Sequence, residues 1–124
     1  MTASRSKSRH APRLTKARLA AMIEQATVDA YGDSEQITGW FTVIEENLAV
    51  PFETTVLGGQ VTVERIDLDR AEQIIAICRR GRARQSLPIM DLPLPMPLPN
   101  GAEWIEAYRR WRAERYGPLS RGTQ

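Results

Sequence analysis

The apolar positions in the first part of the chain repeat with the period of an α-helix. One stripe consists of Leu19, Met22, Ile23, Ala26 and Ala30, and the next of Ile37, Trp40, Phe41, Ile44 and Leu48. The first predicts an amphipathic helix over residues 13–31, which Gly32 would end as a left-handed residue. Asp33 or Ser34 is the predicted N-cap of a second helix, which Pro51 stops. Two equal stripes joined by a short turn predict a helical hairpin or two steeply crossing helices.

After Pro51 the apolar period changes to two, which is the period of β-strands. Two pairs of such segments follow: residues 52–57 with 60–67, and residues 73–80 with 84–90. The first pair flanks Gly58-Gly59 and the second flanks Gly81, so the pattern predicts two β-hairpins. Four or five short antiparallel strands are enough for a small curled sheet or an SH3-like barrel.

The next segment is rich in proline, at positions 88, 93, 95, 97 and 99. Because proline cannot donate to a regular ladder, we expect residues 87–99 to form an extended strap across the domain's own surface. A ligand for SH3-type domains is the alternative interpretation. Residues 102–116 then predict a last helix, with an apolar face made of Trp104, Ile105, Tyr108 and Trp111.

These elements together predict an α+β fold with an N-terminal helix pair, a small antiparallel SH3-like barrel and a C-terminal helix. Residues 1–12 are expected to be a disordered basic arm, residues 13–100 the helix pair with the barrel, and residues 101–124 the C-terminal helix and tail. The arm is either a solubilising tail or an electrostatic contact for nucleic acid or an anionic surface.

Composition excludes several classes of protein. A chain of 124 residues with 42% hydrophobic and 26% charged residues is typical of one soluble domain. No apolar run approaches the roughly 20 residues that a membrane helix needs. The single Cys78 excludes a disulfide framework, and together with the single His10 it argues against a zinc site or a catalytic triad. We therefore expect a cytoplasmic protein of bacterial type that is not an enzyme.

The net charge of +2 conceals an acidic middle between basic ends. Between Leu19 and Cys78 only Arg65 and Arg70 oppose the acids Glu24, Asp29, Asp33, Glu35, Glu45, Glu46, Glu53, Glu64, Asp67, Asp69 and Glu72. Such an excess of carboxylates creates a negative potential, and hard cations such as Ca²⁺ bind to carboxylate and carbonyl oxygens.

One group of acids lies across the predicted end of the first helix, where unpaired backbone carbonyls also gather. Asp29, Asp33 and Glu35 would supply hard oxygen ligands for Ca²⁺, although their spacing is not that of an EF-hand. The alternative interpretation makes Asp33 an ordinary N-cap and Glu35 a first-turn partner of the helix dipole.

A second acidic group, Glu45 and Glu46 with Glu53, follows at the other end of the second helix. Glu46 lies roughly 16 Å from Glu35 at about 1.5 Å per residue, so one ion cannot bind to both groups. The second group is either a further calcium site or a solvated acidic face.

Four arginines surround Gly81 at the predicted tip of the second hairpin: Arg79, Arg80, Arg82 and Arg84. No aromatic residues are interleaved with them for base stacking, so nucleic acid is not the expected partner. A solvated hairpin tip is the preferred interpretation, and pairing with the acidic helices is one form that it could take.

Several stretches of the chain, in order, resemble one known family: Val28-Asp29-Ala30-Tyr31-Gly32, Glu35-Gln36, Gly39-Trp40, Glu45-Glu46-Asn47-Leu48 and Pro51-Phe52. They resemble the opening of the small bacterial CcbP-like calcium-binding proteins, over roughly residues 20–90. The resemblance implies a small helix-plus-β-barrel fold that binds calcium through acidic side chains, without catalysis. By position, the resemblance implies that Asp29, Glu35, Glu45 and Glu46 are candidate calcium-binding residues. Asp33 is adjacent to them in the sequence.

The leading hypothesis is therefore a protein that buffers or senses Ca²⁺ through Asp29, Asp33, Glu35, Glu45 and Glu46. The competing hypothesis is an adaptor that binds a protein partner through the proline strap and the helix of Trp104 and Trp111. A nucleic-acid accessory that uses the basic arm and the arginine tip is a third class. No membrane partner is expected.

Overall fold

The structure, a computed structural model, describes residues 14–116. Its elements are α2 (Lys16–Thr27), α3 (Asp33–Asn47), β1 (Phe52–Val56), β2 (Gly59–Leu68), β3 (Ile74–Arg80), β4 (Ala83–Pro88) and α4 (Ala102–Tyr116). The predicted basic arm and the tail beyond Tyr116 lie outside the described residues. Within residues 14–116, no helix has both the length and the apolar character that crossing a membrane requires.

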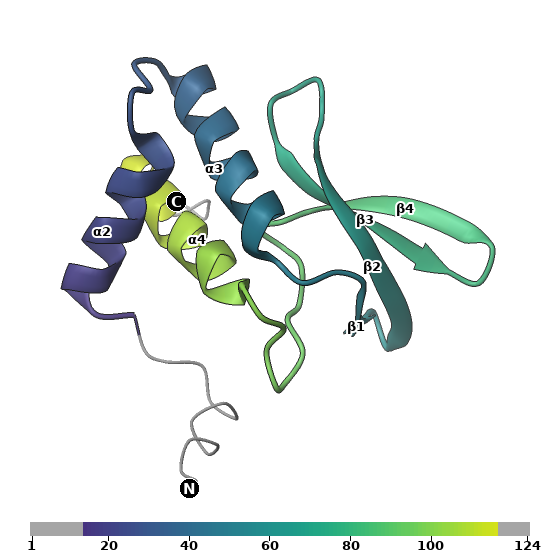
Figure 1. Cartoon of the computed structure of the whole chain (residues 1–124). Coiled ribbons are helices and arrows are strands. Elements are labelled where there is room, and N and C mark those ends of the chain that lie inside the picture. The colour runs from purple at the N-terminus through teal and green to yellow at the C-terminus, as the bar shows by residue number, and fades with distance from the viewer. Residues whose placement is uncertain (1–13, 117–124) are drawn as a thin grey trace, which may run out of the picture.

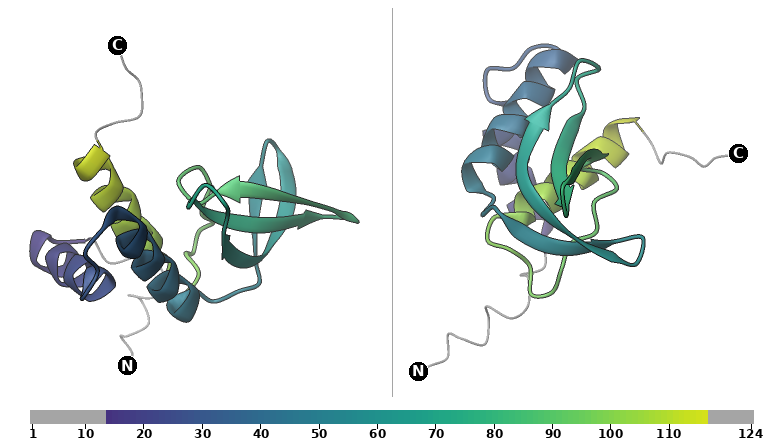
Figure 2. Two further views of the ribbon diagram at one scale, coloured as in Figure 1. Left: turned by 90° about the horizontal axis from the view of Figure 1, so that it is seen from above. Right: turned by 90° about the vertical axis from the view of Figure 1, so that its right-hand side faces the viewer.

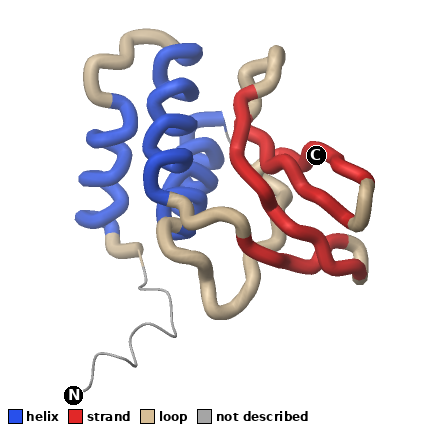
Figure 3. The backbone as a smooth tube through the Cα atoms, turned by 45° about the vertical axis from the view of Figure 1, so that its right-hand side comes forward, coloured by secondary structure: helices blue, strands red, loops and turns tan. Residues whose placement is uncertain are grey.

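The three helices form one layer and the four strands the other (Figures 1 and 3). Helices α3 and α4 lie between α2 and the sheet, as the view from above shows (Figure 2). Helix α3 packs against α2, α4 and β2, so it is the element that joins the two layers. The predicted α+β class, with a helix pair first and a helix last, is confirmed.

The first helix is shorter than its apolar stripe predicts. Thr15 caps α2 by accepting a hydrogen bond from the Arg18 backbone N–H at 3.0 Å, and the helix ends at Thr27. Asp29 then takes the left-handed conformation, with φ of 58°, whereas Gly32 is extended, with φ of −133°. The prediction that Gly32 is the left-handed residue was wrong, because aspartate also tolerates positive φ. Gly32 is instead the N-cap of α3, so the prediction of Asp33 or Ser34 was wrong too.

Helices α2 and α3 approach closely at Gly39. A Cβ atom added there would lie 2.1 Å from the backbone oxygen of Ala26, a buried residue of α2. We expect Gly39→Ala to lower the free energy of unfolding by about 1–3 kcal/mol, because the two backbones must move apart. Urea denaturation measures this effect, with Gly32→Ala as the control, since a Cβ at Gly32 has nothing within 4 Å. Equal stabilities of the two variants would contradict the close packing.

The sheet is antiparallel throughout, in the order β1-β2-β3-β4. The first turn is Leu57-Gly58, with φ of 51° and 77°, one residue earlier than predicted, and Gly59 already pairs with Val56. Two positive φ values are what a tight hairpin turn of matching twist requires. The two hairpins are confirmed, although β4 ends at Pro88 rather than at residue 90.

The SH3-like barrel is not confirmed, because the sheet is open. Strands β1 and β4 are its two edges, and they do not pair with each other. Residues 83–86 of β4 are all exposed to solvent, which is the expected state of an edge strand. Closing a barrel needs strong curvature and a continuous ladder, and four short strands supply neither here.

The proline-rich segment returns the chain from β4 to α4 along the body of the domain. Thr54 of β1 donates a hydrogen bond to the Pro93 carbonyl at 2.7 Å, and the Ala49 N–H donates to the Asn100 carbonyl at 2.8 Å. Arg109 of α4 donates to the carbonyls of Ile89 and Leu92, whose side chains are buried. The segment is therefore a strap on its own domain, as the proline pattern predicts.

Helix α4 supplies much of the core. Its buried residues are Ala102, Trp104, Ile105, Ala107, Tyr108 and Trp111. Three of these surround the fully buried ring of Trp40 in α3: the centroid distances are 6.4 Å to Trp104, 5.7 Å to Tyr108 and 5.6 Å to Trp111. The predicted apolar face of the last helix is confirmed as a face that packs inward.

Candidate functional site

Asp29 lies in the loop between α2 and α3, with its side chain exposed. The Ala30 N–H donates to the Thr27 carbonyl at 3.0 Å, which closes the turn that ends α2. Asp29 therefore lies beyond the end of α2, whereas the predicted helix over residues 13–31 would have included it. Its carboxylate is presented to solvent by a residue in the left-handed conformation.

Asp33 and Glu35 lie in the first turn of α3, and each carboxylate already has a partner within the protein. Glu35 Oε1 accepts a hydrogen bond from the Tyr31 backbone N–H at 2.8 Å, which holds the loop against the helix start. Asp33 Oδ1 lies 2.8 Å from Nη2 of Arg115, in the last turn of α4. Both acids lie at the positive end of the helix dipole, as the alternative interpretation expects for Glu35.

The fold brings a further carboxylate, that of Glu72, to the start of α3. The turn between β2 and β3 is held by Asp69, whose Oδ1 accepts from the N–H groups of Ala71 and Gln73, both at 2.9 Å. Glu72, with φ of 63°, then accepts a hydrogen bond from the Ser34 hydroxyl at 2.8 Å. We call Asp29, Asp33, Glu35 and Glu72 the acidic corner. Sequence reasoning missed Glu72, because no local pattern indicates a contact with a residue 38 positions away.

The second predicted group stays apart from the acidic corner. Glu45 and Glu46 are exposed near the end of α3, whereas the corner lies at its start. Glu53 of β1 accepts a hydrogen bond from the Gln60 side chain across the hairpin. The structure thus keeps the two predicted groups at opposite ends of one helix.

Neither group is a ready-made metal site. Within residues 14–116, no three His, Cys, Asp or Glu side chains lie close enough together to hold a metal ion. The donors of the acidic corner fit a hard cation in their chemistry, since all are carboxylate oxygens and the hydroxyl oxygen of Ser34 lies beside them. A cation that binds to Asp33 must displace Arg115 and is repelled by the positive end of the helix dipole.

A sequence comparison decides the family. A family model for calcium-binding proteins of the CcbP type, described as "Calcium binding", matches residues 20–112. The chain belongs to the CcbP calcium-binding family. The match reaches into α4, so it includes the proline strap and most of the last helix. The resemblance seen in the sequence motifs covers only roughly residues 20–90.

Solved structures of the CcbP type share this fold. One, described as a calcium-binding protein in the calcium-binding form, has a TM-score of 0.64 and 16% identity, over 78% of this chain and 90% of its own. Another, CcbP from Anabaena, has a TM-score of 0.63 and 16% identity, over 84% of this chain and 95% of its own. No functionally curated protein matches the chain.

The structure leaves the competing hypotheses with little support. Trp104 and Trp111, which an adaptor would present to a partner, are 6% and 7% exposed and face the core. At the arginine tip, Glu64 binds Arg79 Nε at 2.7 Å and Arg84 Nε at 2.8 Å, and Arg80 donates to the Val56 carbonyl. Two of the four tip arginines, Arg79 and Arg84, thus pair with Glu64 of β2 rather than with the acidic helices.

Glu64 occupies the point where the register of β2 shifts against β3, between Val63 and Arg65. Hydrogen bonds from Arg84 and Arg79 hold the pKa of Glu64 below its ordinary value of 4.5. This stabilisation is therefore present above the unfolded-state pKa and is lost as the pH falls through the lower folded-state pKa. We expect Glu64→Gln to lower the melting temperature at neutral pH, with a gap that narrows in acid.

Thermal melts of the two proteins from pH 7 down to about pH 3 test this effect of Glu64. Glu24→Gln is the control, because Glu24 is exposed on α2 and takes part in none of the ion pairs found among residues 14–116. A melting-temperature gap for Glu64→Gln that stays constant over the whole range would contradict the prediction.

Proposed function

We propose that this chain binds Ca²⁺ and acts as a non-catalytic buffer or sensor of the ion. Membership of the CcbP calcium-binding family over residues 20–112 carries this proposal. Its fold is shared with a protein described as being in the calcium-binding form, which supports the same conclusion. The acidic middle of the chain supplies the negative potential that attracts a cation.

The acidic corner is the proposed principal site, with Asp29, Asp33, Glu35 and Glu72 as ligands. The hydrogen bond between Ser34 and Glu72 supports this choice, because it holds an acid of the β2–β3 turn against the start of α3. Three different elements thus contribute oxygen donors: the α2–α3 loop, α3 itself and the β2–β3 turn. Glu45 and Glu46 form the proposed second, weaker site at the other end of α3.

Binding at the acidic corner is an exchange of partners. Without the ion, Arg115 pairs with Asp33, the Tyr31 N–H with Glu35 and the Ser34 hydroxyl with Glu72. Calcium replaces some of these contacts and cancels the repulsion between the carboxylates. Because no rigid loop arranges the ligands in advance, we expect micromolar or weaker affinity and low selectivity over Mg²⁺.

Calorimetric titration of the full chain with Ca²⁺, and separately with Mg²⁺, tests the proposed function. We expect a saturable heat with Ca²⁺, at micromolar or weaker affinity, and a weaker response to Mg²⁺. No binding heat with Ca²⁺ up to millimolar concentration at two temperatures would overturn the proposal. The second temperature guards against a binding enthalpy that is close to zero at the first.

A buffer and a sensor differ in what the ion does to the rest of the domain. Arg115 lies over the Trp111 ring, with its guanidinium carbon 5.3 Å from the centroid, so release of Arg115 from Asp33 would change the surroundings of this tryptophan. A change in tryptophan emission that follows calcium occupancy, and that Arg115→Met removes, supports a sensor. Unchanged emission at saturation supports a buffer.

A further inference from the structure

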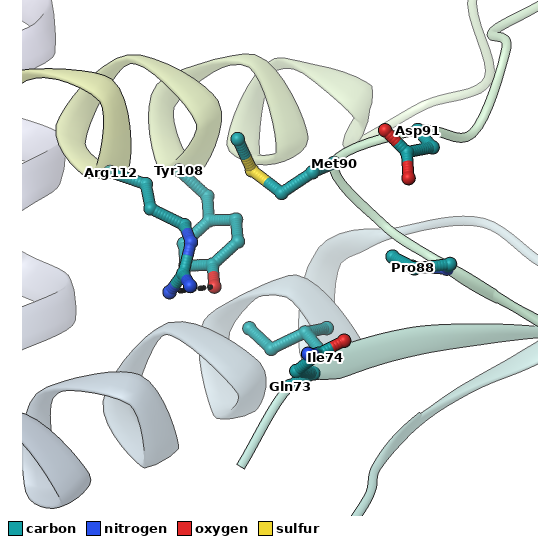
Figure 4. Close-up of a pocket in the computed structure, with 7 residues that line it drawn as sticks. All are labelled: Gln73, Ile74, Pro88, Met90, Asp91, Tyr108 and Arg112. Atoms are coloured by element: carbon teal, nitrogen blue, oxygen red, sulfur yellow. Dashed lines mark hydrogen bonds between the residues drawn. The ribbon is translucent and has the colours of Figure 1, made fainter. Parts of the chain in front are cut away.

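A cavity of about 280 Å³ lies between the start of β3, the end of β4 and α4 (Figure 4). None of the acidic corner residues lines it. Its lining residues are Gln73, Ile74, Pro88, Met90, Asp91, Tyr108 and Arg112. At roughly 30 Å³ per liquid water, the volume equals about nine waters, which is also the space of a ligand with about ten non-hydrogen atoms. The cavity is thus slightly smaller than the pockets that bind drug-sized molecules.

Arg112 gives one side of the cavity unused hydrogen-bond donors. Its Nη1 donates to the Tyr108 hydroxyl at 3.3 Å, and its guanidinium carbon lies 5.0 Å from the centroid of the Tyr116 ring. The ion pairs found among residues 14–116 do not include Arg112. A guanidinium has five N–H donors in a planar fork that matches a carboxylate, so most of its binding capacity remains.

The Tyr108 hydroxyl is a second donor beside Arg112. Burial raises the pKa of this phenol above its ordinary value of 10, which keeps it protonated at neutral pH. Its oxygen accepts from Arg112, and the same hydroxyl can also donate its own hydrogen to a ligand atom. Arg112 and Tyr108 together therefore form a pair of donors for one carboxylate.

Asp91 lies on the opposite side of the cavity from Arg112, with Met90 between them (Figure 4). The nearby Arg109 donates to the backbone carbonyls of Ile89 and Leu92, and no ion pair joins it to Asp91 in the described part of the chain. The cavity thus has an anion at one side, a cation at the other and apolar side chains between them.

We propose that this cavity binds a small zwitterion: a molecule with a carboxylate at one end, an ammonium group at the other and an apolar body. The carboxylate binds to Arg112 and the Tyr108 hydroxyl, and the ammonium group to Asp91. The apolar body lies against Ile74, Pro88 and Met90. Both charged side chains gain an oppositely charged partner, and the ion pairs found among residues 14–116 include neither of them.

Titrations of the full chain with ε-aminocaproate, in the presence of EDTA so that calcium plays no part, test this proposal. Amide chemical shifts of Gln73, Asp91 and Arg112 report the occupied cavity. We expect about millimolar affinity, with γ-aminobutyrate, caproate and hexylamine each several-fold weaker. The first of these is shorter by two methylene groups, the second lacks the ammonium group and the third lacks the carboxylate.

Two variants locate the binding. Arg112→Gln and Asp91→Asn should each weaken the binding of ε-aminocaproate about tenfold, because each removes one charge-assisted contact. The matched controls are Arg110→Gln and Glu114→Gln, which change exposed residues of the same helix outside the cavity lining. Asp91 is itself exposed, so its variant should fold even if Arg112→Gln does not.

Three results would overturn the proposal. The first is that none of the four compounds shifts the cavity resonances at millimolar concentration. The second is that caproate binds as well as ε-aminocaproate and Asp91→Asn leaves both affinities unchanged. The third is that ε-aminocaproate binds equally well to the wild-type chain and to both cavity variants.

Discussion

A chain that ends at Asn100 is expected not to fold, whereas a chain that ends at Tyr116 should fold like the full protein. The shorter chain lacks α4 and exposes the Trp40 ring, which is 0% exposed in the structure. Removal of one buried aromatic side chain costs about 3–5 kcal/mol, and the whole stability of a domain is about 5–15 kcal/mol. The loss of Trp104, Tyr108 and Trp111 together is therefore comparable to the whole stability of such a domain, so the shorter chain should not keep a cooperative fold.

Circular dichroism melts of the two truncated chains decide this prediction. Absence of a cooperative transition is expected for the chain that ends at Asn100. The experiment also tests the predicted boundary at residue 100, since a cooperative melt of residues 1–100 would make α4 an appendage to an independent domain.

Calcium is expected to raise the melting temperature by about 10–20 °C at an ion concentration roughly a hundred times the dissociation constant. Such a concentration stabilises the folded state by about 2.7 kcal/mol, and each kcal/mol raises the melting temperature of a small domain by about 4–8 °C. Glu72→Gln should remove much of this rise, because it deletes one charge from the acidic corner. Glu46→Gln should leave most of it.

The glutamine at position 72 still offers an oxygen to the Ser34 hydroxyl, so the calcium-free stabilities of the two variants should be similar. This makes Glu46→Gln a matched control. If Glu46→Gln loses the rise and Glu72→Gln keeps it, the principal site lies at the end of α3 instead. If neither the wild-type chain nor a variant responds, calcium binding itself is refuted.

The helices and hairpins were largely predictable because each has a local signature. The stripe of Trp104, Ile105, Tyr108 and Trp111 predicts the range 102–116 that α4 occupies. The end of α2 was not predictable in this way, since Asp29 changes to positive φ while the apolar period still continues to Ala30. The backbone conformation of one residue does not appear in a periodicity.

The sheet likewise has one feature that the sequence predicts and one that it does not. Alternating residues and glycine turns predict the two hairpins, because a strand and its turn are neighbours in sequence. Whether β1 and β4 meet depends on curvature summed over the whole sheet, and the alternation is the same in an open sheet and in a barrel. The class of the sheet followed from the sequence, and its closure did not.

For the candidate site, the sequence by itself determined which acids are available and where they lie along the chain, since charge and spacing are local properties. Only the tertiary structure decided which of them meet. Ser34 and Glu72 are 38 residues apart, and Asp33 and Arg115 are 82 residues apart. Such contacts result from how α3 packs against the sheet and α4, which depends on the shape of the shared core rather than on any residue's neighbours.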